Sequence, residues 1–197
     1  MEGLRAMPVN YTNRKGQTYV LCQGTTKTGK PRFFFAREPK GELVDAVPDG
    51  YHIEESVNGV VSLAKDRPQV IARAELAAVE AALKRRPKRR DYQVRIKDHT
   101  LVIFERQGPD IAALQSIFGH LGPLPRSAVE HLEQAGQYIP ILRFILLERE
   151  QRVFAAQRWH FSGSIDDWID VGHSGQIADL ARTLVPRLGT DAYFELY

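Results

Sequence analysis

The chain is short of cysteine and of long apolar runs, and each shortage excludes a class of protein. Cys22 is the only cysteine among 197 residues, so neither an intrachain disulfide nor a cysteine-based zinc site can form. No stretch reaches the roughly 18–20 apolar residues of a membrane-spanning helix. The most apolar segment, 139–147, is interrupted by Pro140 and Arg143. The first residues also lack the apolar core of a secretory signal. These shortages predict a cytoplasmic protein with no membrane partner.

Recognised catalytic and cofactor motifs are missing as well. Ser162 in Phe-Ser-Gly-Ser does not match the Gly-x-Ser-x-Gly nucleophile elbow. Lys30 follows Gly29 as in a phosphate-binding loop, but Pro31 stands where Ser or Thr is required. We therefore assign no catalytic residue, no metal ligand and no cofactor, and we expect the chain to act by binding rather than by catalysis.

One acidic and histidine-containing segment keeps an enzymatic alternative open. His160, Asp166, Asp167, Asp170 and His173 fall within 14 residues, and these are side chains that divalent-metal hydrolases use. Their spacing matches no recognised metal motif. The spacing of Ser164 and Asp167 is instead typical of a helix start, with Trp159 and Trp168 anchoring the segment in the core.

The hydrophobic periodicity predicts an α+β fold. It indicates an N-terminal antiparallel β-meander plus a helix and a hairpin, followed by an α-α-β-β-α half. The expected segments are strands at 18–21, 32–37, 42–47, 52–57 and 60–64, a helix at 73–86, a hairpin at 92–104, helices from 111 and from 127, a hairpin at 141–161, a helix near 177–184, and a tail or edge strand at 192–197.

Gln107-Gly108-Pro109 is the expected boundary between two modules. Residues 1–108 form a basic β-rich module with one helix, and residues 109–197 form an α+β module. Two arrangements stay open, namely two separate cores or one core that both modules share.

Positive charge is concentrated in the first part of the chain. Residues 1–110 contain 20 lysines and arginines against 14 acidic residues, whereas residues 111–197 contain 7 against 10. Such asymmetry is typical of a chain in which one part faces a polyanion.

The densest cationic segment follows the predicted helix at 73–86. Six of its seven residues are basic: Lys84, Arg85, Arg86, Lys88, Arg89 and Arg90. Such side chains can contact the phosphates of nucleic acid and release condensed counterions. The alternative is a solvated run whose cations interact favourably with the C-terminal end of the helix dipole.

A second basic group lies on the first predicted hairpin. Lys27, Lys30 and Arg32 surround its turn, and three phenylalanines follow at 33–35. Because side chains alternate along a strand, we expect Phe33 and Phe35 to be buried. Phe34 should lie at a rim on the same face as Arg32, where it could stack on a base.

The two basic groups favour a binding module for an anionic partner, most simply nucleic acid. This hypothesis assumes that Lys27, Lys30, Arg32 and Phe34 share one surface with the segment 84–90. A protein-interaction or regulatory module, including a homodimer, is the first alternative. A metal-dependent hydrolase using His160, Asp166, Asp167 and His173 is the second.

Overall fold

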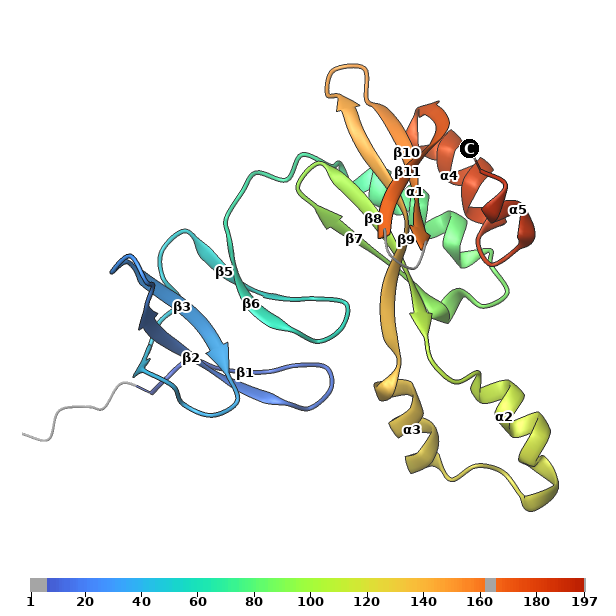
Figure 1. Ribbon diagram of the computed structural model, residues 1–197. Coiled ribbons are helices and arrows are strands. Elements are labelled where there is room, and N and C mark those ends of the chain that lie inside the picture. Colours follow the sequence, from blue (N-terminus) through green and yellow to red (C-terminus); the bar gives the residue numbers. More distant parts are fainter. Residues whose placement is uncertain (1–6, 162–165, 197) are drawn as a thin grey trace, which may run out of the picture. The chain divides into compact units, whose positions relative to one another are not determined.

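The computed structural model describes residues 7–161 and 166–196, apart from the side chains of Ala112, Phe118, Leu121 and Gln134. The chain forms two compact units, Met1–Pro68 and Gln69–Tyr197, which we call the N-terminal unit and the C-terminal unit. Antiparallel sheets occur in both units and helices in the second, so the α+β prediction is confirmed. Figure 1 shows the elements of each unit.

The N-terminal unit consists of short antiparallel strands. Its strands are β1 (Asn10–Thr12), β2 (Thr18–Thr25), β3 (Pro31–Ala36), β4 (Glu42–Leu43), β5 (Tyr51–Glu55) and β6 (Val61–Lys65). The expected first hairpin is β2–β3, and β5–β6 form a two-stranded sheet of their own. β4 pairs with Cys22 and Gln23 of β2 instead of with β5, so this part is not a simple meander.

Two turns of the N-terminal unit are joined by a buried asparagine. Asn13 is 3% exposed, and its Nδ2 donates to the carbonyl oxygen of Gly59 at 2.7 Å. Gly59 closes the β5–β6 turn with φ +79°, a left-handed conformation in which glycine avoids the Cβ penalty. Because a buried amide without a partner is costly, this contact fixes the β1–β2 turn against the β5–β6 turn.

The C-terminal unit contains a five-stranded antiparallel sheet in the order β11-β10-β9-β8-β7. Its strands are β7 (Tyr92–Lys97), β8 (Thr100–Gln107), β9 (Gln137–Glu148), β10 (Val153–Phe161) and β11 (Asp166–Gly175). Its helical elements are α1 (Arg73–Lys84), η1 (Arg89–Asp91), α2 (Ile111–Phe118), η2 (Gly119–Leu121), α3 (Arg126–Ala135), α4 (Ile177–Leu184), η3 (Val185–Arg187) and α5 (Asp191–Phe194).

The helices α1 and α4 pack on one face of this sheet. Val79 of α1 and Leu184 of α4 are fully buried in the same apolar cluster as Leu101 and Phe144 of the sheet. Burying one such side chain contributes about 1.5–3 kcal/mol, so this cluster is the main source of stability of the C-terminal unit. Figure 1 shows α1, α4 and α5 gathered on one side of the sheet.

Two segments near the C-terminus differ from the expectation. Residues 166–175 form the strand β11 rather than the beginning of a helix, because Trp168 lies opposite Trp159 of β10 and Asp170 opposite Gln157. The expected tail or edge strand at 192–197 includes the short helix α5, whose buried Tyr193 donates a hydrogen bond to the carbonyl oxygen of Ile141.

The division into units also differs from the boundary expected at residues 107–109. The sheet is continuous there, because β8 pairs with β9 from Thr100–Ile145 to Gln107–Gln137. The two strands therefore belong to one core, and the compact units separate between Pro68 and Gln69 instead.

The expected helices at 111 and 127 form an insertion between β8 and β9. Figure 1 shows α2 and α3 projecting beyond the ends of these strands. Ile111 and Leu114 are half-buried and Ile117 is exposed, so this apolar stripe is not part of the main core. Among the helices that the structure describes, none has both the length and the apolar character required to cross a bilayer.

Candidate nucleic-acid interface

The basic run at residues 84–90 does not form one surface, because its side chains point in different directions at the end of α1. Val79 and Leu83 of α1 are buried against the core. Arg86 follows them at helical spacing, so it continues the inward face. Lys84 and Arg85 lie on the exposed side.

Arg86 is a structural residue of the C-terminal unit. Its Nη1 donates to the carbonyl oxygen of Pro186 at 2.5 Å, and its Nη2 donates to that of Leu188. Its guanidinium also lies 5.8 Å from the ring centroid of Tyr92. These contacts join the end of α1 to the chain after α4, so the prediction that Arg86 is a free phosphate-binding cation needs correction.

Lys88 is also engaged, in this case by a carboxylate. Its Nζ lies 3.0 Å from Oδ2 of Asp110, and this hydrogen bond together with the attraction of the carboxylate raises the pKa of Lys88. Both side chains are largely exposed, so the pair contributes little to stability. A phosphate would have to compete with Asp110 for this ammonium group.

Four cations of the run remain available to a ligand. Lys84, Arg85, Arg89 and Arg90 are exposed and have no ion-pair partner among the described residues. Arg85 contributes to a small pocket of about 140 Å³ that is also lined by Arg86 and Arg182. Among the described residues that line this pocket none carries a carboxylate, although Asp179 pairs with Arg182.

A larger groove, lined in part by Lys88, Arg89 and Arg90 of the run, is electrically balanced. It has a volume of about 790 Å³, and its lining contains four cationic and four acidic side chains. Arg106, which is 85% buried, pairs with Asp91 at 3.4 Å within it. Because the charges compensate, the groove as a whole does not attract a polyanion, and Arg89 and Arg90 of its lining can contact phosphates only as individual side chains.

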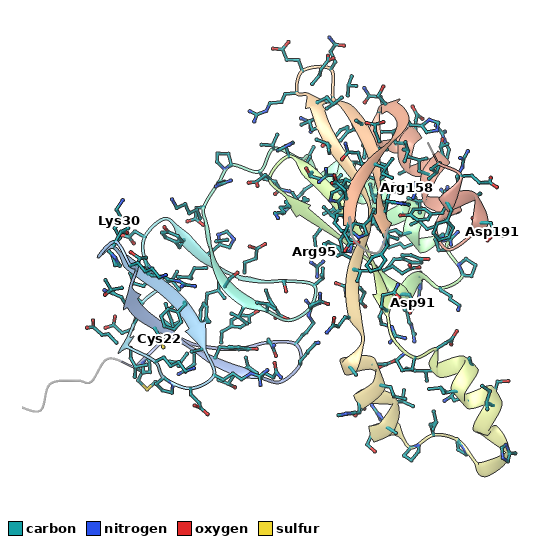
Figure 2. The ribbon with its side chains drawn as sticks, in the orientation of Figure 1. Cys22, Lys30, Asp91, Arg95, Arg158 and Asp191 are labelled. Atoms are coloured by element: carbon teal, nitrogen blue, oxygen red, sulfur yellow. The ribbon has the colours of Figure 1, made fainter. Side chains whose placement is uncertain are left out.

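The second basic group lies on the β2–β3 hairpin. Lys27, Lys30 and Arg32 are exposed, and Figure 2 shows Lys30 at the turn end of the hairpin. From Thr18 to Arg37 the chain contains four cations and no acidic residue. The guanidinium of Arg32 lies 5.9 Å from the ring centroid of Phe34, which confirms that these two share a face.

The burial of the three phenylalanines of β3 differs from the expectation. Phe33, Phe34 and Phe35 are all half-buried, so the prediction that Phe33 and Phe35 lie in the core and only Phe34 at a rim was wrong. Among the described strands β3 pairs only with β2, so it is an edge strand of its sheet.

The two basic groups belong to different units. The hairpin group lies in the N-terminal unit and residues 84–90 in the C-terminal unit. Their union in one continuous platform stays a prediction.

The residues of the hydrolase alternative are distributed along two strands. His160 of β10 lies opposite Asp167 of β11, and its Nδ1 lies 3.4 Å from Nη1 of Arg158. Asp170 Oδ1 accepts a hydrogen bond from the backbone of Gly172. Within residues 7–161 and 166–196, no group of three acidic, histidine or cysteine side chains is placed to hold a metal ion.

Sequence reasoning missed Arg182, which is almost 100 residues from Arg85 and carries no local signal. It also missed the role of Arg86, for which a signal exists, namely the helical face formed by Val79, Leu83 and Arg86. Comparison of the chain with protein-family models, with curated proteins and with solved structures finds no match.

Proposed function

We propose that the chain binds nucleic acid through the phosphate backbone, using two separate cationic clusters. The hairpin cluster consists of Lys27, Lys30 and Arg32, and the helix-end cluster consists of Lys84, Arg85, Arg89 and Arg90. The observation that carries the proposal is that all seven side chains are exposed and lack an ion-pair partner within the described part of the chain.

Unpaired surface cations are what phosphate contacts require. A lysine or arginine that is already paired must exchange one carboxylate for a phosphate, whereas an unpaired one gains the release of condensed counterions. The arginine-lined pocket beside Arg85 adds a concave place for one phosphate, because Arg85 can donate there within the field of Arg86 and Arg182.

The hairpin cluster contributes a second element of recognition. Arg32 and Phe34 place a cation and a half-exposed aromatic ring on one face of β3. This combination suits a single strand, in which a phosphate contacts the cation and a base stacks on the ring. A strand long enough to contact both clusters at once would bind more tightly than either cluster alone allows, through effective concentration.

The proposal is tested by fluorescence anisotropy with a labelled single-stranded oligonucleotide at low salt. The triple variant Arg85→Gln/Arg89→Gln/Arg90→Gln should bind at least about tenfold more weakly than the wild type, because each phosphate contact contributes to the electrostatic free energy. A second variant, Lys27→Gln/Lys30→Gln/Arg32→Gln, should show a loss of similar size.

The matched control removes three exposed arginines elsewhere in the C-terminal unit, as Arg73→Gln/Arg126→Gln/Arg149→Gln. Its net charge equals that of the helix-end variant. Equal weakening by the control would mean that overall charge alone attracts the oligonucleotide, and the proposed interface would be wrong. Absence of binding by the wild type at low salt would refute nucleic-acid binding altogether.

A further inference from the structure

The five-stranded sheet has a second face that points away from the helices. Along β8, Leu101 and Ile103 belong to the core shared with α1 and α4, whereas Val102 lies outside it. The same alternation on β10 places Phe154 and Ala156 in that core and Ala155 outside it. Because side chains alternate between the faces of a sheet, Val102 and Ala155 identify the opposite surface, which we call the open face.

One row of directly paired residues crosses the open face on all five strands. From β7 to β11 the row is Arg95, Val102, Arg143, Gln157 and Asp170. Its charge therefore changes from positive at one edge to negative at the other. Figure 2 shows Arg95 at the position of β7.

Neighbouring side chains extend the same polarity at both edges. Lys97 is two residues from Arg95 on β7, and Asp166 is four residues from Asp170 on β11, so each lies on the open face with its neighbour. Lys97 and Asp166 are exposed, as are Arg95 and Asp170. Each edge strand therefore presents two charges of one sign on this face.

The β10–β11 side of the open face is aromatic. The rings of Trp159 and Trp168 pack edge to face with centroids 5.1 Å apart, and the guanidinium of Arg143 lies 4.3 Å from the centroid of Trp168. Ile145 is half-buried, and Phe161, next to Trp159 on the same face, is 75% exposed. Exposed aromatic side chains together with arginine are enriched in protein–protein interfaces.

We propose that the open face binds the open face of a second copy of this chain. A twofold axis parallel to the strands would place β7 of one copy over β11 of the other, so that Arg95 meets Asp170 at both ends of the row. An axis perpendicular to the strands would place β7 over β7 and bring like charges together. A twofold interface must be complementary to itself, and the charge polarity of this row meets that requirement for one axis only.

The size of the face indicates a dimer that dissociates on dilution. Five strands about 4.8 Å apart, each contributing roughly six residues of about 3.3 Å, give a flat area near 500 Å². Because side chains make the surface uneven, the accessible area of the face is larger than this flat area and approaches the roughly 800 Å² per partner of standard interfaces. The dimer is therefore at the small end of specific associations, and its formation does not depend on nucleic-acid binding.

The first test uses the two tryptophans, which are the only ones in the chain and both lie on the open face. Sedimentation equilibrium should show a monomer–dimer equilibrium, and tryptophan emission should shift to shorter wavelength over the same concentration range. A monomer at all accessible concentrations would overturn the proposal. A monomer whose emission responds only to added single-stranded oligonucleotide would overturn it too, since nucleic acid would then occupy the face.

The second test exchanges the charges of the two edges. The variant Arg95→Glu/Lys97→Glu and the variant Asp166→Lys/Asp170→Lys should each dimerise at least about tenfold more weakly than the wild type, because like charges now oppose each other. An equimolar mixture of the two should form a heterodimer, because each changed edge then meets one of opposite sign. Restored association also shows that both variants are folded.

The control is the double reversal Arg126→Glu/Arg149→Glu, which changes exposed charges outside the five strands, in α3 and in the β9–β10 turn. It should dimerise like the wild type. If the mixture of edge variants stays monomeric, or if the control loses dimerisation to the same extent, the proposed docking of the two faces is wrong.

Discussion

The two adjacent arginines at the end of α1 provide a direct check on the division between structural and ligand-binding cations. Arg86→Gln removes two hydrogen bonds to the carbonyl oxygens of Pro186 and Leu188 and a contact with the ring of Tyr92. Arg85→Gln removes a charge of the same sign from an exposed side chain. Both variants change the net charge equally, so any difference between them reports on these contacts.

The expected cost follows from the burial of each contact. A hydrogen bond from a charged donor contributes about 1.5–3 kcal/mol. The part-buried Arg86–Leu188 bond is counted at the lower end of this range, and the exposed Arg86–Pro186 bond, which water can replace, is not counted. The contact with Tyr92 adds about 0.5 kcal/mol. We therefore expect Arg86→Gln to lower the free energy of unfolding by about 2 kcal/mol, and Arg85→Gln to change it by less than about 0.5 kcal/mol.

Urea denaturation followed by far-ultraviolet circular dichroism measures both values. With a slope m that stays constant, the Arg86→Gln variant should show a clearly lower midpoint and Arg85→Gln an unchanged one. Equal stability of the two variants, or a larger loss for Arg85→Gln, would refute the assignment of Arg86 as the residue that holds the chain after α4.

Two further changes test contacts that hold the C-terminal unit together. Burial alone would raise the pKa of Glu75, but hydrogen bonds from Arg152 and from the Ala72 backbone lower it below the usual 4.5. The loss of stability in Glu75→Gln should therefore be complete above pH 4.5 and should disappear as the pH falls through the lowered native pKa. Denaturation at several pH values measures this dependence. Burial raises the pKa of Tyr193 to about 12, and its hydroxyl donates to Ile141 at 2.5 Å. Tyr193→Phe should cost about 1–3 kcal/mol at neutral pH, and the difference from the wild type should shrink as the pH rises from 10 towards 12, where the native hydroxyl ionises.

Local patterns were sufficient for most of the elements. The helix at Arg73–Lys84 was predictable because Leu76, Val79 and Leu83 recur on one face, and the hairpins because apolar runs flank short polar turns. β11 was not, since its acidic residues and glycine resemble a helix start or a loop. Its identity as a strand depends on pairing with β10, and a cross-strand partner leaves no local signal.

The candidate sites show the same limit. Six cations within residues 84–90 were visible in the sequence, but only the end of α1 decides that Arg86 points inward while Arg85 faces solvent. The open face was not recognised, because Trp159 and Trp168 were interpreted as core anchors. The charge polarity from Arg95 to Asp170 exists only in the register of five strands.

The salt dependence of oligonucleotide binding tests the central proposal most directly. If the seven exposed cations of the two clusters contact the phosphates of a single strand, the slope of log K against log salt should approach about −5, from about −0.7 per contact. Replacing Arg85, Arg89 and Arg90 by glutamine should make this slope less negative by about 2. A slope near zero, or an unchanged slope in that variant, would contradict nucleic-acid binding through these clusters.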